Sequence, residues 1–168
     1  MNDEFLATYL NDHHAGSVGA IELLKHSIKA NEGNEFAVVL QNFLNEISEE
    51  QTLLKKLIER IDSKKSSLKN VGGWIAEKLS RLKINNPLTP YSDENRFLEF
   101  EALFLGVNGK LDLWKVMTEC FSEESRFSDF DFSTLLKQSE QQRDYLQKHC
   151  IKAAKIAFQT KLRGKNEN

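Results

Sequence analysis

The sequence predicts an all-α fold, a bundle of four long helices with one long crossover connection, and three observations carry this prediction. The 168 residues include only 8 Gly and 2 Pro, which leaves little turn chemistry for a fold built from sheets. Apolar side chains recur every three or four residues in four separate stretches, the spacing of a buried helix face. These stretches are joined by a short link, a long link and another short link. That order is typical of a bundle with one crossover, and we expect a single domain over residues 1–168.

The first two helices are expected over residues 3–30 and 34–62, joined by a short turn. Asn2 or Asp3 can cap the first helix, and Gly33 lies just past its end, where glycine is favoured. The second stretch carries a nearly unbroken apolar stripe at helical spacing. A short link between two long helices predicts that they pack side by side and antiparallel.

The third and fourth helices are expected over residues 93–121 and 132–162, again as an antiparallel pair. Ser92 is a favourable N-cap for the third helix, because its hydroxyl can accept a hydrogen bond from the first turn. The link before it has about thirty residues, and an unstructured link of that length would be unusual in a compact domain. Apolar residues at helical spacing predict a short fifth helix over 66–83 within this link, which ends before Pro87. The second and third helices then run parallel.

Composition and charge exclude several classes of protein. The 23 Lys and Arg nearly balance the 25 Asp and Glu, and a formal net charge of −2 argues against a dedicated nucleic-acid-binding protein. The basic stretch at 55–83 leaves RNA or anionic lipid as an alternative partner. No stretch is apolar enough to cross a membrane, and the acidic start does not resemble an export signal. We therefore expect a cytoplasmic protein with no membrane partner, in which Cys120 and Cys150 are free thiols.

One polar layer is predicted inside the bundle. His13 and Ser17 lie on the apolar face of the first helix, and Glu50 is the one polar residue in the apolar stripe of the second. Antiparallel packing places residue 13 level with residue 50, and in the second pair it places Asn108 level with Arg143. A buried carboxylate needs a cationic partner, so we expect Arg143 to pair with Glu50. The five residues would form a buried polar network or line a ligand site.

A resemblance to a known family accompanies this topology. The run YLNDHHAGS at residues 9–17 is similar to the first helix of small uncharacterised bacterial members of the ferritin-like superfamily. The order of helices over about residues 3–162 resembles that superfamily as well. The resemblance implies iron held by carboxylates from two helices and by Glu-x-x-His motifs from the other two. The chain contains no Glu-x-x-His, and Arg143 follows Glu140 where that motif would place a histidine.

A second polar layer is predicted about 10 Å away along the bundle, where Glu101 lies level with His149. A degenerate metal-binding or redox member of the ferritin-like class would use His13, Glu50, Glu101 and His149 to hold iron or another divalent metal. We favour the interpretation without a cofactor, because a guanidinium at position 143 cannot ligate a cation.

The third helix is apolar on nearly every side between Phe97 and Trp114. A helix with this pattern is buried all round. We expect the crossover helix to cover its outer face, and the alternative is a second copy of the chain in a homodimer.

Several other residues carry simpler expectations. His14 and His26 lie off the apolar stripe of the first helix and should face solvent. Gly16 and Gly19 should allow a close approach between helices, and Cys150 should fill part of the core.

The sequence contains neither a glycine-rich phosphate loop nor the motif of a hydrolase nucleophile. We therefore expect a non-enzymatic helical bundle with a buried polar core, which serves as a small-ligand or protein-interaction module.

Overall fold

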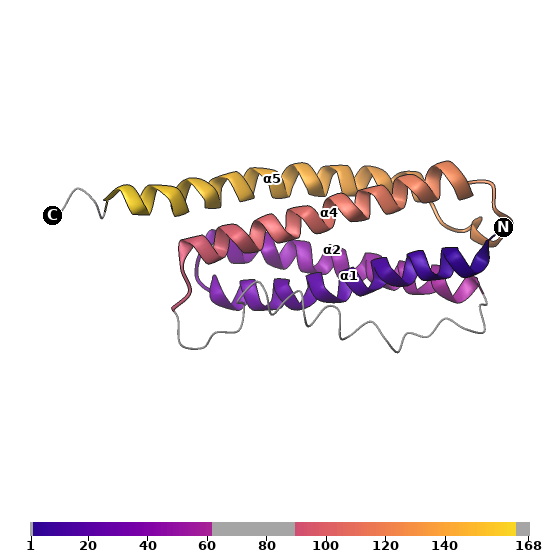
Figure 1. The fold of residues 1–168 in the computed structure, drawn as a ribbon, viewed down its shortest axis with the longest axis horizontal. Helices are drawn as coiled ribbons and strands as arrows, with labels where there is room; N and C mark the ends of the chain where they lie inside the picture. Colours follow the sequence, from indigo (N-terminus) through magenta and orange to yellow (C-terminus); the bar gives the residue numbers. More distant parts are fainter. Residues whose placement is uncertain (1, 62–89, 164–168) are drawn as a thin grey trace.

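The computed structural model describes residues 2–61 and 90–163, which form an all-helical bundle (Figure 1). Its long helices are α1 (Asp3–Ala30), α2 (Glu35–Arg60), α4 (Asp93–Phe121) and α5 (Phe132–Arg163), and the 3₁₀ turn η2 (Ser125–Phe127) lies between the last two. No strand occurs within the described ranges, so the predicted all-α class is confirmed there. The predicted fifth helix, 66–83, lies outside them.

Each long helix starts at a polar side chain that satisfies the first turn. The side chains of Asn2, Asn34, Ser92 and Asp131 each accept a hydrogen bond from a backbone N–H group of the helix that follows. Such caps replace the hydrogen bonds that the first turn of a helix cannot make within itself. The turn between α1 and α2 passes through Gly33, whose φ of +85° suits a residue without a Cβ atom.

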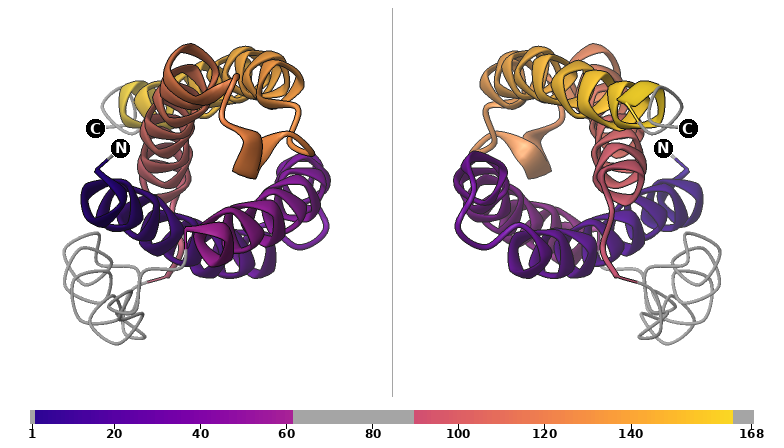
Figure 2. Two further views of the ribbon diagram at one scale, coloured as in Figure 1. Left: turned by 90° about the vertical axis from the view of Figure 1, so that its right-hand side faces the viewer. Right: turned by 90° about the vertical axis from the view of Figure 1, so that its left-hand side faces the viewer.

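The helices alternate in direction around the bundle. Figure 1 shows α1 and α5 running one way and α2 and α4 the other. Seen along the bundle in Figure 2, α1 lies next to α2 and α4, while α5 lies next to α4 and α2. The direct contacts of α1 with α2, of α4 with α5 and of α1 with α4 agree with this arrangement. Since α2 ends and α4 begins at opposite ends of the bundle, the link between them is a crossover.

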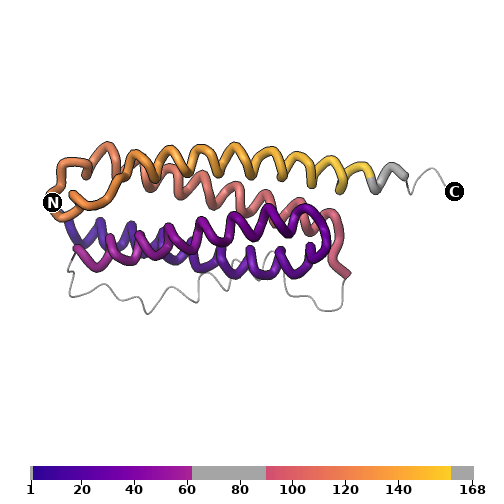
Figure 3. The backbone as a smooth tube through the Cα atoms, turned by 180° about the vertical axis from the view of Figure 1, so that it is seen from behind, coloured from indigo at the N-terminus to yellow at the C-terminus, as the bar shows by residue number. Residues whose placement is uncertain are grey.

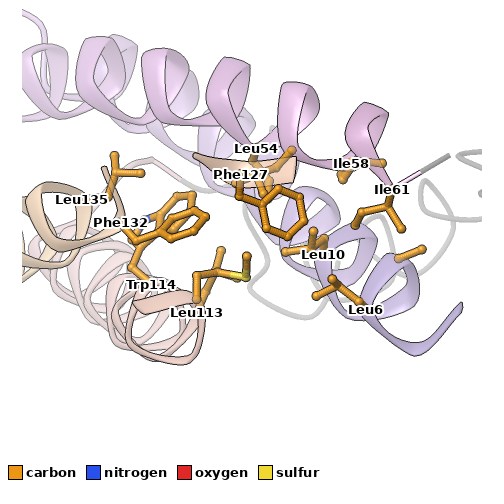
Figure 4. Close-up of a cluster of buried hydrophobic side chains, with 13 residues drawn as sticks. Leu6, Leu10, Leu54, Ile58, Ile61, Leu113, Trp114, Phe127, Phe132 and Leu135 are labelled. Carbon is orange, nitrogen blue, oxygen red and sulfur yellow. The ribbon is translucent and has the colours of Figure 1, made fainter. Parts of the chain in front are cut away.

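Two apolar clusters fill the interior, one towards each end. The first gathers where η2 closes the bundle, and Figure 4 shows Phe127 of η2 set among side chains of the long helices. Trp114 stacks on Phe132 there, with ring centroids 6.4 Å apart. The second cluster lies towards the α1–α2 turn and includes Leu24, Leu40 and Phe100. In α2, α4 and α5, the segment between the two clusters carries polar side chains, and these form the candidate site.

The last turns of α5 extend beyond the other three helices, as the tube in Figure 3 shows. Near this end of α5, Phe158 exposes 65% of its surface, although its ring also packs 5.7 Å from that of Phe97 near the start of α4. Within the described part of the chain, no helix combines the length and the hydropathy needed to cross a membrane.

Candidate functional site

A buried ion pair crosses the middle of the bundle. The Nζ atom of Lys110 lies 2.7 Å from Oε2 of Glu50, and their side chains are only 14% and 8% exposed. Because α2 and α4 occupy opposite corners of the bundle, this pair spans its interior. A buried charge is tolerated when a partner of opposite charge and hydrogen bonds replace its water.

Gln142 of α5 completes the polar network. Its Nε2 atom donates to Oε1 of Glu50 and to Oε2 of Glu46, at 2.8 Å each. Its Oε1 atom accepts a hydrogen bond from the Lys110 ammonium group. The network therefore joins three of the four long helices through side chains that have little exposure to water.

Burial lowers the pKa of Lys110, and the neighbouring carboxylate of Glu50 opposes that change by stabilising the ammonium form. The ammonium nitrogen also lies 5.9 Å from the centroid of the Phe43 ring, within the range of a cation–π contact. An ammonium group has three N–H donors, and within the described residues Glu50 and Gln142 account for two of them.

A cavity of about 740 Å³ lies beside this ion pair, between α1 and α4, with α2 as its floor. Most of its lining is apolar, and Glu50 and Lys110 are charged groups in it. Gly16, Gly106 and Gly109 also line it, and a Cβ atom added at any of them would meet nothing within 4 Å. The expectation that Gly16 brings helices into close contact is therefore wrong: this glycine borders open space.

A second cavity of about 750 Å³ lies on the other side of the network, between α2 and α5. It is the more acidic of the two, because Glu46, Glu49, Asp129 and Asp131 all line it. Glu50 lines both cavities. The ion pair and Gln142 therefore form a polar partition between an apolar cavity and an acidic groove.

Three of the predicted layer residues line the apolar cavity: His13, Ser17 and Glu50. The Ser17 hydroxyl donates to the backbone oxygen of His14 at 2.7 Å and accepts from Nε2 of Gln51 at 2.9 Å. The contact between Ser17 and Gln51 shows that α1 and α2 are offset from the predicted register by about five residues, or roughly 7.5 Å along the helix axis. Burial lowers the pKa of His13, so this imidazole is more readily neutral.

Arg143 does not pair with Glu50, which corrects the prediction. Its guanidinium donates to the adjacent Asp144 at 2.8 and 3.0 Å, away from the layer. Adjacent helix positions diverge by about 100°, and the inward position of α5 is Gln142, one residue earlier. Lys110 supplies the cation that the sequence analysis assigned to position 143.

Asn108 also lies outside the network, because its side-chain amide donates to the backbone oxygen of Phe104 at 2.8 Å. Lys110 was missed because position 110 interrupts an apolar run. A signal was nevertheless present, since position 110 falls between the buried Val107 and Trp114 at spacings of three and four residues.

The two residues of the second predicted layer, Glu101 and His149, lie outside the central network. Glu101 is exposed, and Nδ1 of His149 lies 2.9 Å from the backbone oxygen of Tyr145 on its own helix. In the part of the chain that the structure describes, His, Cys, Asp and Glu side chains form no group of three that could hold a metal. The Glu50 carboxylate is already neutralised by an ammonium group that would repel a cation. Both observations weaken the case for iron or another divalent metal at these residues.

Of the two histidines expected in solvent, His14 is buried and the side chain of His26 is 36% exposed. His14 is only 7% exposed, and neither ring nitrogen finds a hydrogen-bond partner among the described residues. Burial lowers its pKa, and the positive charge of Lys55 acts in the same direction. Nδ1 of His26 lies 3.1 Å from Oε1 of Glu99. Both expectations assumed that only one narrow stripe of α1 faces protein, whereas α1 packs against α2 and α4.

Glu99 is the centre of a second buried network, which no local sequence pattern predicts. Its carboxylate accepts hydrogen bonds from Ser27 and Tyr91 at 2.7 Å each, in addition to its contact with His26. Burial, and then the nearby Glu99 charge, raise the pKa of Tyr91. The network ties the end of α1 to the start of α4, and neither described cavity includes Glu99 in its lining. We interpret it as a structural clasp.

Comparison of the chain with protein-family models, with curated proteins and with solved structures finds no match. The geometry of the central site is therefore the basis for a functional proposal.

Proposed function

We propose that the protein is a non-enzymatic helical bundle that binds a small, largely apolar ligand in the cavity between α1 and α4. Its volume of about 740 Å³ falls within the roughly 300–1,000 Å³ typical of small-molecule sites. An apolar lining with a few convergent polar groups is also typical of such sites. Glu50 and Lys110 supply these groups at the floor of the cavity.

The helical glycines are the observation that carries this proposal. Gly in a helix interior costs about 0.5–1 kcal/mol relative to Ala. At Gly16, Gly106 and Gly109 no neighbouring atom requires that cost, because a Cβ atom would meet nothing within 4 Å. All three border the cavity, where the missing side chains leave room for a ligand.

The test is binding of the neutral fluorescent probe N-phenyl-1-naphthylamine to the full chain. Gly106→Leu and Gly16→Leu should each fill part of the cavity and weaken binding about tenfold, equivalent to about 1.4 kcal/mol. Thr52→Leu is the matched control, because it adds a leucine to an exposed position of α2 outside the cavity lining. Equal probe affinity in the filled variants and the control would overturn the proposal.

We further propose the ferritin-like connectivity, with a crossover helix over 66–83. The parallel directions of α2 and α4 support this proposal, since they require a connection along the bundle. Ala76→Pro should then remove helical circular dichroism, because proline costs about 3 kcal/mol in a helix interior. Unchanged helix content would argue against a helix at 66–83.

A homodimer through α4 is a second proposal, favoured by Leu98 and Leu105, which expose 47% and 65% of their surface on this helix. Large exposed apolar side chains often mark interaction sites. Light scattering of the wild-type chain and of Leu98→Glu should show a dimer that the substitution dissociates. A wild-type monomer would exclude this interface.

The degenerate metal-binding alternative predicts stoichiometric iron or another divalent metal in protein purified without chelators, and elemental analysis tests it directly. Lys110 beside Glu50 makes this the weaker proposal. The cytoplasmic location and the low affinity for nucleic acid both stay predictions from the sequence.

A further inference from the structure

Lys110 brings a primary amine to the floor of a largely apolar cavity. Both Lys110 and Phe43 line this cavity, and the ammonium nitrogen lies 5.9 Å from the centroid of the Phe43 ring. A ligand held there would therefore lie next to the one lysine that lines the cavity among the described residues. Surface lysines have no such enclosure.

Glu50 supplies the proton acceptor that a reactive amine needs. Its Oε2 atom lies 2.7 Å from Nζ of Lys110, a distance at which the carboxylate can take a proton from the ammonium group. Gln142 bonds to both side chains and holds them in place. Lysine becomes nucleophilic when it is desolvated in an apolar pocket with a group that can accept its proton.

We propose that Lys110 forms a reversible imine with an apolar aldehyde or ketone bound in this cavity, an inference that rests on the ligand-binding function proposed above. The cavity supplies the affinity for the apolar part of the ligand. The amine then selects ligands that carry a reactive carbonyl group.

The reaction needs no oxidant or reductant. Glu50 takes one proton from the ammonium group, and the free amine pair forms a C–N bond to the carbonyl carbon. The carbonyl π pair moves to oxygen, and one proton passes from the new ammonium nitrogen to this oxygen to give a neutral carbinolamine. Protonated Glu50 returns its proton to the hydroxyl group, the nitrogen pair forms the C=N bond as the C–O bond breaks, and the oxygen leaves as water. The product is a protonated imine, whose positive charge stays opposite Glu50, so the ion pair survives the reaction.

The test is reductive trapping on the whole 168-residue chain at near-neutral pH with decanal and sodium cyanoborohydride, followed by peptide mapping. Cyanoborohydride converts the imine into a stable secondary amine. We expect Lys110 to be labelled about tenfold faster than any other lysine, because binding holds the carbonyl beside this amine. Propanal, which gains little from an apolar cavity, should lose most of that preference. Equal labelling of all lysines by decanal, or an unlabelled Lys110, would overturn the inference.

Three variants test whether the preferred labelling depends on the Lys110 amine and on the cavity beside it. Lys110→Arg keeps a positive charge opposite Glu50 and removes the amine, so the preferred label should disappear. Lys115→Arg is the matched control on an exposed position of α4 and should leave it unchanged. Gly106→Leu keeps the amine and fills the cavity, and it should slow labelling of Lys110 about tenfold.

Decanol separates the two proposals, because it has the same chain and no carbonyl group. Displacement of N-phenyl-1-naphthylamine by decanol, without preferred trapping of decanal on Lys110, would leave the ligand cavity intact and refute the imine. Failure of the fluorescent probe itself to bind, together with unselective trapping, would refute both.

Discussion

The interior of the bundle holds the Lys110 ammonium group because Glu50 balances its charge and Gln142 supplies hydrogen bonds to both side chains. Removing one member of such a pair leaves the other buried without its partner. Replacing both members with apolar side chains removes the charges together and is often neutral or stabilising.

We therefore expect Lys110→Met to lower the free energy of unfolding by about 3–5 kcal/mol, the usual cost of an uncompensated buried charge. The double variant Lys110→Met/Glu50→Leu should recover most of that loss. Urea denaturation measures both, and the exposed Lys115→Met serves as the control. A single variant as stable as the control would show that Glu50 does not depend on Lys110.

A second prediction at this scale concerns Gly106. A Cβ atom at this position would meet nothing within 4 Å, so alanine can be added without a clash. Gly106→Ala should raise the free energy of unfolding by about 0.5–1 kcal/mol, because alanine restricts the unfolded chain and favours helix. Thermal and urea unfolding test this, and a loss of stability would mean that the cavity wall is closed at this point.

Single residues also show which part of the site could be predicted. Glu50 could be found because it is the only polar residue in a long apolar stripe. Its hydrogen-bond partner on α5 could not be chosen in this way, because Arg143 and Gln142 lie at nearly the same height and point about 100° apart. Long side chains add to this uncertainty, because the lysine chain reaches its partner from α4 across the interior.

At the scale of the element, the start of α5 shows how one carboxylate orders a helix. Asp131 accepts hydrogen bonds from the Thr134 backbone N–H and from the hydroxyls of Ser133 and Thr134. These bonds favour the charged form and lower the pKa of Asp131 from 3.8 to about 2.

The folded pKa of Asp131 therefore lies below its unfolded value. Its contribution to stability is fully present above pH 3.8 and is lost as the pH falls towards about 2. Asp131→Asn retains a capping side chain and cannot titrate, so the pH dependence of the unfolding free energy between these values should become shallower. Denaturation across this range tests the prediction, with the exposed Asp144→Asn as a control. An unchanged slope would contradict it.

The described helices lie within two residues of their predicted bounds, because apolar periodicity and capping residues are both local signals. The clasp around Glu99 was not predictable in this way. It joins His26 and Ser27 to Tyr91 and Glu99 across more than sixty positions of chain, and only the packing of α1 against α4 brings them together.

At the scale of the whole molecule, all four long helices contribute to the apolar cluster at each end of the bundle. Because the same four helices form both clusters, partial unfolding at one end should destabilise the packing at the other. This arrangement favours one cooperative transition, as is usual for a chain of this size.

We therefore expect unfolding curves from far-ultraviolet circular dichroism and from Trp114 fluorescence to coincide in the Trp74→Phe variant, in which Trp114 is the only tryptophan. Circular dichroism follows all helices, whereas Trp114 reports on the cluster near η2. Curves with different midpoints would show that the two ends unfold separately, and would contradict the single domain predicted from the sequence.

The polar layer between the two apolar clusters determines how the four helices align along the bundle axis. Four apolar helix faces could slide past one another by one turn, about 5.4 Å, and still bury similar areas. After such a slip, Lys110 and Glu50 would no longer lie at the same height, so their ion pair and their shared hydrogen bonds to Gln142 would be broken. The layer therefore specifies the register of the helices: it stabilises one alignment and destabilises those shifted by one turn. A bundle in which apolar side chains replace this polar layer should be no less stable, but it should populate more than one helix register.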